Sequence, residues 1–209
     1  MEPKYIVFDG MDGSGKGTQI ELLRKKFPGD RAVVFTREPG GTPFAEKIRT
    51  LVRDDPLAGQ TTALAQALLF LAAREELRYS LVAPALADGR HVFSDRGDSS
   101  TFAFQLCGEE RKDELMDLFV LTRKLILPEP DMYIVFDLPA DVARTRALRD
   151  AKRNPNHFDV RDLAYYERVR EGFRDFARLA SVEFVNALRT PEEIHGEVMA
   201  ILYTIGIAL

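Results

Sequence analysis

The chain has 209 residues, enough for one ample domain or for one domain with a small mobile insert. An apolar fraction of 45% can fill a core, and a formal net charge of −4 gives no general attraction to nucleic acid or anionic membranes. The single cysteine, Cys107, excludes an internal disulfide and suits a reducing compartment. There is no signal-peptide pattern and no run near the ~18 apolar residues of a membrane span. We therefore expect a cytoplasmic protein with no nucleic-acid or membrane partner.

Short apolar runs alternate with helical patterns along the chain, which is typical of βα units and a parallel sheet. Strands are predicted at 4–9, 31–36, 90–95, 131–137 and 182–186. Helices are predicted near 16–27, 43–53, 60–87, 110–126, 139–152, 160–180 and 191–206. The segment 62–73 is apolar nearly all round, so both of its faces should be covered. We expect the sheet to cover one face and a second subunit to cover the other.

A glycine-rich loop, FDGMDGSGKGT at residues 8–18, follows the first strand and leads into the first helix. Such a loop holds nucleotide phosphates, because glycines let backbone N–H groups turn around an anion and the helix N-terminus adds partial positive charge. Lys16 would reach the outer phosphates. The pattern GxxxxGK[ST] is met except at its last position, where Gly17 stands before Thr18. An unliganded turn is the alternative. The predicted ATP-binding residues are Gly10, Met11, Asp12, Gly13, Ser14, Gly15, Lys16, Gly17 and Thr18.

Four further stretches follow in order: TREPGGT at 36–42, LLFLAAR at 68–74, DRGDSSTFAFQ at 95–105 and PDMYIVFDLP at 130–139. Together with the loop they resemble the thymidylate kinase (dTMP kinase) family, from about residue 4 to about residue 195. The resemblance implies one P-loop α/β/α domain over 1–209, with a five-stranded parallel sheet and a small lid at about 149–159. It also implies a homodimer that phosphorylates dTMP with ATP and Mg²⁺.

Two side chains on the predicted long helix suit a pyrimidine base. Phe70 and Arg74 are four residues apart, so they share one helix face. An aromatic ring can stack on the base while the guanidinium donates to a base oxygen, and the resemblance gives the matching pair this role. Without the resemblance, a core phenylalanine and a solvated arginine would be the simpler interpretation.

Asp95 and Arg96 close the third predicted strand at its carboxyl end, where ligands bind in such sheets. The planar fork of Arg96 suits the substrate monophosphate. Asp95, with Thr18 as a second candidate, is placed to hold Mg²⁺ through water. Arg49 is either a second phosphate clamp or an exposed helix charge. The resemblance assigns Asp12 to the sugar 3′-hydroxyl. The predicted substrate-binding residues are Asp12, Arg49, Phe70, Arg74, Arg96, Ser100, Thr101 and Phe104.

Arg146, Arg149 and Arg153 are spaced three and then four residues apart, so they line one helical face that leads into the lid. A positioned arginine accelerates related phosphoryl transfers by on the order of 10³–10⁵. With Gly13 after the loop acid, the chain resembles family members that supply this arginine from the lid. A solvated basic stripe is the alternative. The predicted catalytic residues are Lys16, Asp95, Arg96, Arg149 and Arg153.

Some positions depart from the family pattern and leave alternatives open. Phe104 stands where the family usually has tyrosine, and the lid reads HFD at 157–159 in place of Arg-Phe-Glu. A kinase for dUMP, UMP or a nucleoside is one alternative. A non-catalytic nucleotide sensor is another, with Gly17 as a mark of decay, but the intact Lys16, Asp95 and Arg96 argue against it.

Overall fold

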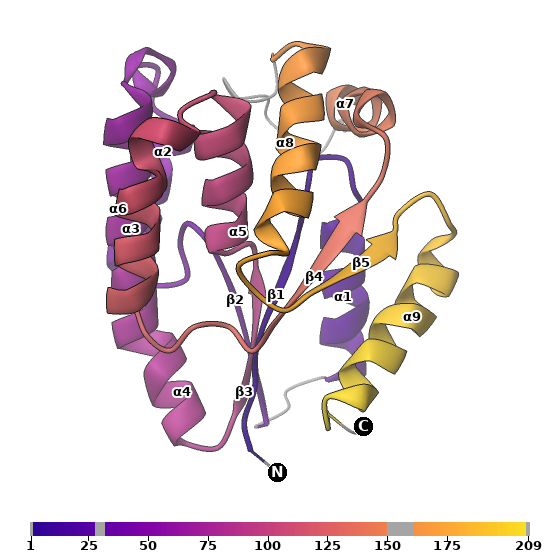
Figure 1. The fold of residues 1–209 in the computed structure, drawn as a ribbon. Helices are drawn as coiled ribbons and strands as arrows, with labels where there is room; N and C mark the ends of the chain where they lie inside the picture. The colour runs from indigo at the N-terminus through magenta and orange to yellow at the C-terminus, as the bar shows by residue number, and fades with distance from the viewer. Residues whose placement is uncertain (1, 28–31, 150–160, 208–209) are drawn as a thin grey trace.

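The computed structural model describes residues 2–27, 32–149 and 161–207. At its centre lies a five-stranded sheet of order β2-β3-β1-β4-β5, in which every neighbouring pair is parallel (Figure 1). The strands are β1 (Tyr5–Gly10), β2 (Val33–Arg37), β3 (His91–Asp95), β4 (Met132–Asp137) and β5 (Val182–Asn186). Each overlaps a predicted strand. The predicted fold class, a parallel α/β sheet covered by helices, is confirmed.

The regular helices are α1 (Lys16–Lys26), α2 (Pro43–Arg53), α3 (Ala63–Leu77), α4 (Ala83–Ala87), α5 (Asp98–Ser100), α6 (Lys112–Leu125), α7 (Ala140–Arg149), α8 (Leu163–Phe176) and α9 (Pro191–Thr204). Three further turns are η1 (Ala58–Gln60), a 3₁₀ turn, and the π-helical η2 (Arg78–Val82) and η3 (Thr101–Gly108). Within these described ranges no helix is long and apolar enough to cross a membrane.

The core lies on both faces of the central strands. All six residues of β1 are buried, and so are the four central residues of β4. Such strands are continuously apolar because helices cover both faces of a parallel sheet. Helices α1 and α9 lie side by side on one face, and α3, α5 and α8 lie on the other (Figure 1). The loops at the carboxyl edge of the sheet are therefore anchored to a packed core.

Two helical segments differ from the predictions. The predicted helix 60–87 is divided into η1, α3, η2 and α4. Pro84 has no backbone N–H to donate to the preceding turn, and the N–H of Ala83 bonds the carbonyl of Arg78, five residues back. The helical run α5–η3 was not predicted. Most of its residues are buried, so it carries no apolar stripe of the kind that marks a surface helix.

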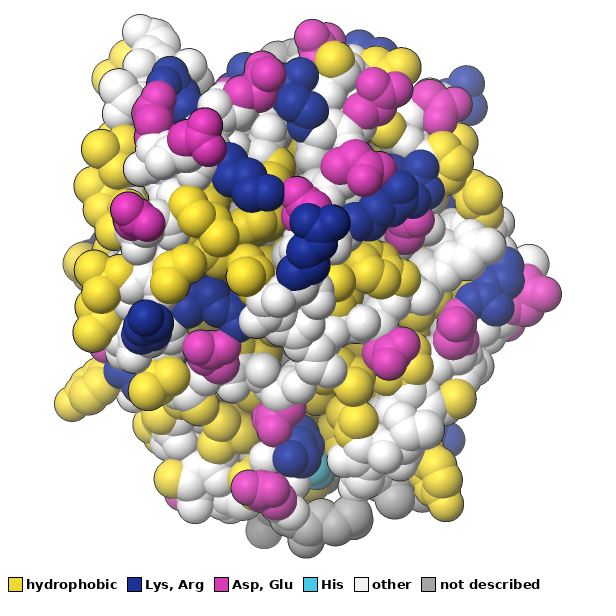
Figure 2. All heavy atoms as spheres, in the orientation of Figure 1, with side chains coloured by type: hydrophobic (Ala, Val, Ile, Leu, Met, Phe, Trp, Pro, Cys, Tyr) yellow, Lys and Arg dark blue, Asp and Glu magenta, His cyan; other side chains and the backbone are white. Residues whose placement is uncertain are grey.

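The segment 62–73 is covered on one side only. Leu71 and Ala73 are buried, whereas Leu64 and Leu68 each keep 48% of their surface exposed. Other exposed apolar side chains are Phe44 and Leu51 on α2, Tyr79 on η2, and Leu121 and Leu125 on α6. Figure 2 shows hydrophobic side chains gathered along the margin where α2, α3 and α6 lie in Figure 1.

Candidate active site

The residues singled out in the sequence meet at the carboxyl edge of the sheet. The glycine-rich loop follows β1, Glu38 and Pro39 follow β2, and Arg96 follows β3. They line one cleft of about 850 Å³, which also receives side chains of α1, α2, α3 and η3. Ligands bind at this edge in open α/β sheets, because successive strands deliver their loops to the same place.

The loop presents an uncapped helix N-terminus to this cleft. Gly15, at the N-cap of α1, has φ 83°, and no side chain caps the helix. The first N–H groups of α1 are thus available to an anion, which the helix dipole also favours. Lys16 is buried beside them, with its Nζ 3.7 Å from Oδ1 of Asp95. Burial and the nearby Arg96 lower the pKa of Lys16. The negative charge of a bound phosphate would oppose both the effect of burial and the repulsion from Arg96, and would raise the pKa of Lys16.

Gly13 is the point at which α7 rests on the loop. Its φ is +81°, and a Cβ there would lie 2.3 Å from the carbonyl oxygen of Ala143 and 2.9 Å from the backbone nitrogen of Ala147. No side-chain rearrangement relieves a clash with backbone atoms. The glycine therefore lets α7, which leads towards the predicted lid, lie directly against the phosphate loop.

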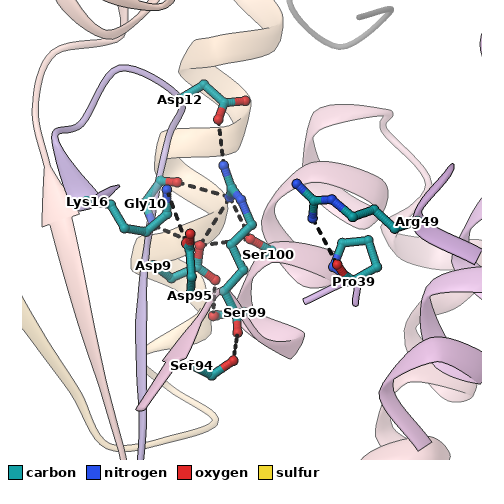
Figure 3. A network of polar contacts seen from close by, with 11 residues as sticks. Asp9, Gly10, Asp12, Lys16, Pro39, Arg49, Ser94, Asp95, Ser99 and Ser100 are labelled. Atoms are coloured by element: carbon teal, nitrogen blue, oxygen red, sulfur yellow. Dashed lines mark hydrogen bonds and ion pairs between the residues drawn. The ribbon is translucent and has the colours of Figure 1, made fainter. Parts of the chain in front are cut away.

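Arg96 is held inside a cluster of acceptors, of which Asp9, Asp12 and Ser100 are labelled in Figure 3. Its Nη2 donates to Asp12 at 2.7 Å, and its Nη1 lies 3.2 Å from Asp9 and 2.8 Å from the hydroxyl of Ser100. Burial opposes the charge on this guanidinium, but Asp12, Asp9 and then Asp95 outweigh it and raise the pKa of Arg96. The arginine is a permanent cation next to the phosphate loop.

Arg49 contributes a second cation to the cleft. Its Nη1 donates to the carbonyl of Pro39 at 2.9 Å, and Figure 3 shows it across the cleft from Lys16. Among the described residues it has no carboxylate partner within ion-pair distance. Burial, together with repulsion from Arg37 and Arg53, lowers the pKa of Arg49 to about 10. A cation without a counter-ion in a cleft favours an anionic ligand.

At the other end of the cleft, Arg74 is fixed by two neighbours. Its Nε donates to Glu38 at 2.7 Å and its Nη2 donates to the hydroxyl of Thr101 at 2.9 Å. Burial opposes its charge, but Glu38 and Asp98 raise the pKa of Arg74. Phe70 lines the same cleft one turn away. No described residue accepts a hydrogen bond from Nη1 of Arg74, which lies beside an aromatic ring and can donate to a ligand.

The oxygen atoms near Lys16 suit a hard cation that keeps much of its water. Oδ1 of Asp95 is buried and has no hydrogen-bond partner among the described residues. Thr18 is exposed and also lines the cleft. The described residues include no group of three or more His, Cys, Asp or Glu that could hold a metal by itself. This donor set fits Mg²⁺, which proteins typically bind through one or two carboxylates and the phosphates of a substrate.

The other predicted site residues fall into three groups. Asp12 to Thr18 line the cleft, as do Ser100, Thr101 and Phe104. Gly10 and Met11 do not: Met11 is in the core, and the carbonyl of Gly10 accepts from Arg96. Arg149 is the exposed last residue of α7, whereas Arg153 and the rest of the predicted lid lie outside the described residues.

Several residues that bond to the site or line it were not among the predicted site residues, although Arg146 was noted on the basic helical face. Asp9 and Glu38 hold Arg96 and Arg74, Gln105 lines the cleft, and Arg146 lines it while donating to the carbonyl of Ala187 at 3.0 Å. A signal existed for Asp9, because an acid at the end of an apolar strand needs a partner. Gln105 and Glu38 also lay inside quoted motifs.

A phosphate loop, a buried lysine and two arginines at the carboxyl edge of a five-stranded parallel sheet define a P-loop nucleotide kinase. Comparisons with known proteins agree. The family model described as thymidylate kinase matches residues 8–198. A thymidylate kinase of Burkholderia vietnamiensis is 37% identical over 209 residues, covering 95% of this chain and 97% of that protein.

The thymidylate kinase of Albidiferax ferrireducens is 36% identical over 207 residues and covers 93% of each chain. The crystal structure of thymidylate kinase from Ehrlichia chaffeensis superposes with a TM-score of 0.74 at 29% identity, covering 97% of this chain and 99% of that one. The chain belongs to the thymidylate kinase family.

Proposed function

We propose that the chain transfers the γ-phosphoryl group of ATP to dTMP, giving ADP and dTDP. The observation that carries the proposal is a single cleft lined by Lys16 and its loop, by Arg49 and Arg96, and by Phe70 and Arg74. Those three pairs of features match the phosphates of ATP, the phosphate of a nucleotide acceptor and the base of that acceptor. Family membership selects thymine as the base.

The acceptor phosphate attacks without a general base. Its oxygen is already anionic, so it forms a bond to the γ-phosphorus while the bond from that phosphorus to the β–γ bridging oxygen breaks, and ADP leaves. Lys16 and the loop N–H groups hold the ATP phosphates, and Arg96 with Arg49 holds the acceptor. Catalysis of this kind rests on positioning and charge stabilisation.

Magnesium would be held by Asp95, with Thr18 as the second candidate. Bound there, the ion neutralises charge that develops on the phosphate oxygens. The buried Oδ1 of Asp95, which accepts no hydrogen bond from the part of the chain that the structure describes, supports this assignment. Gly17 in place of a hydroxyl makes Asp95 the main ligand from the protein.

An arginine that approaches from the lid would stabilise the transferred group. We assign this role to Arg149 or Arg153, which share a helical face in the sequence. Since α7 rests on Gly13, a displacement of α7 would change the position of that face relative to the phosphate loop.

A nucleoside kinase is the weaker alternative. A neutral hydroxyl must lose a proton, so the enzyme would need a base near it. Asp12 is the nearest candidate by sequence, but it pairs with Arg96 at 2.7 Å. Phe104, 5.1 Å from the guanidinium of Arg96, keeps the bulk of the family tyrosine on the sugar side. We therefore expect a preference for deoxyribose.

The direct test measures ADP release with Mg-ATP against dTMP, dUMP, UMP, dCMP and AMP in parallel. We expect a rate with dTMP well above the others. A flat or UMP-led profile would keep the fold and overturn the substrate. No turnover with any acceptor, alongside retained ATP binding, would indicate a nucleotide sensor.

We also propose a cytoplasmic homodimer in which a second copy covers the exposed face of α3. Leu64 and Leu68, four residues apart and 48% exposed each, support this partner because an apolar helix face in water is unfavourable. The single cysteine supports a reducing compartment. Light scattering should give twice the chain mass, and Leu64→Glu with Leu68→Glu should give the monomer. A wild-type monomer would contradict the proposal.

A further inference from the structure

Arg96 has a backbone conformation that its surroundings must impose. Its φ is 73°, in the left-handed region, and it is not a glycine. That conformation is strained for an L-residue and persists only where neighbouring contacts determine it. The backbone N–H of Arg96 bonds the carbonyl of Phe8 at 2.9 Å, so the turn is tied to β1. The rest of the restraint acts on its side chain.

The side-chain restraint converges on Asp9, which is fully buried at the end of β1. Its Oδ1 accepts from Nη1 of Arg96 at 3.2 Å, from the hydroxyl of Ser100 at 2.8 Å and from the backbone N–H of Gly10 at 2.8 Å. Its Oδ2 accepts from the hydroxyl of Ser99 at 2.5 Å. Figure 3 shows these groups around one carboxylate. Asp9 thus joins the start of the phosphate loop, α5 and the arginine.

The two ends of the guanidinium have different partners. Nη1 faces inward, to Asp9, Ser100 and the carbonyl of Gly10. Nη2 is held by Asp12 at 2.7 Å, and Asp12 lines the cleft. An arriving phosphate can therefore replace the Asp12 contact at Nη2, while the contacts at Nη1 remain in place.

We infer that Asp9 is a positioning residue for the acceptor-phosphate clamp: it anchors Nη1 of Arg96 so that Nη2 is presented to the monophosphate. This inference rests on the proposed function only in assigning the acceptor phosphate to Arg96. Without the carboxylate, Nη1 would keep only neutral acceptors. The guanidinium would then be drawn towards Asp12, which competes with the phosphate for it.

Asp9→Asn tests the inference because it keeps the shape of the side chain and removes its charge. Calorimetry would measure binding of dTMP and of thymidine, which shares the base and sugar but lacks the phosphate. We expect dTMP affinity to fall by roughly ten- to a hundredfold, the order expected for the loss of one hydrogen bond to a charged group. Thymidine affinity should change by less than about twofold, because it makes no contact with the clamp.

Glu38→Gln is the matched control. It removes the charge of another buried carboxylate that fixes an arginine, but at the base end of the cleft, where Arg74 lies. It should weaken dTMP and thymidine together. Ser99→Ala is a milder variant in case Asp9→Asn fails to fold, since Ser99 touches Asp9 and does not line the cleft. It should weaken dTMP selectively, by a smaller factor.

The outcomes separate the two proposals. If wild type binds dTMP more tightly than thymidine and Asp9→Asn or Ser99→Ala keeps the full preference, the positioning role is wrong. Equal losses for both ligands in Asp9→Asn would assign Asp9 to general support of the site and also overturn the role. If wild type shows no preference for dTMP over thymidine, the assignment of Arg96 to the acceptor phosphate fails first.

Discussion

Gly13→Ala tests whether α7 rests on the phosphate loop. An L-residue at φ +81° costs roughly 1–2 kcal/mol of folding free energy. The added Cβ would also lie 2.3 Å from the carbonyl oxygen of Ala143, and overpacking of this kind costs typically about 1–3 kcal/mol more. Because the clash is with backbone, α7 must move away from the loop. We expect both lower stability and a turnover reduced by on the order of 10²-fold.

Gly89→Ala provides the control for this experiment. Gly89 has φ +77°, and a Cβ there would meet nothing within 4 Å, so it carries the backbone strain without the clash. Urea unfolding would compare the two variants with wild type, and the coupled ADP assay would follow turnover. Gly89→Ala should lose about 1–2 kcal/mol and keep its activity. If Gly13→Ala loses no more stability than Gly89→Ala and keeps wild-type turnover, the reasoning about α7 is refuted.

Three further variants address the parts of the cleft separately. Lys16→Ala should abolish turnover in a folded protein, because the ATP phosphates lose their buried cation. Near-normal activity in the ADP assay would contradict the assignment of the glycine-rich loop to the ATP phosphates. Arg74→Ala should raise the KM for dTMP more than the KM for ATP, since Arg74 lies at the base end; equal rises would make Arg74 structural. Phe104→Tyr should sharpen discrimination between dTMP and its ribonucleotide, measured as the ratio of kcat/KM values, and an unchanged ratio would dismiss Phe104 as the sugar gate.

Short-range spacing in the sequence was enough to predict the strands and the glycine-rich loop, and it placed Phe70 and Arg74 on one helix face. Each of these depends on residues within one or two turns or on one strand–loop–helix unit, so local geometry decides it. The prediction of one continuous helix over 60–87 missed the π-helical turn η2. Pro84 is present in the sequence, but the shift to π-helical bonding depends on how the chain satisfies the carbonyls that lose their N–H partners.

Only the tertiary structure brought the buried anchors to their arginines. The register pairs Phe8 of β1 with Asp95 of β3, so Asp9 lies beside Arg96, 87 residues away in the chain. Glu38 and Arg74 lie in the connection between β2 and β3, and Thr101 lies in the connection between β3 and β4. The three meet only when β2 and β3 are neighbours and α3 packs against η3. A carboxylate in the sequence carries no mark of its partner, because the partner is set by strand order and register. The sequence therefore specified the groups that we propose meet the ligand, and the fold decided which residues hold them in place.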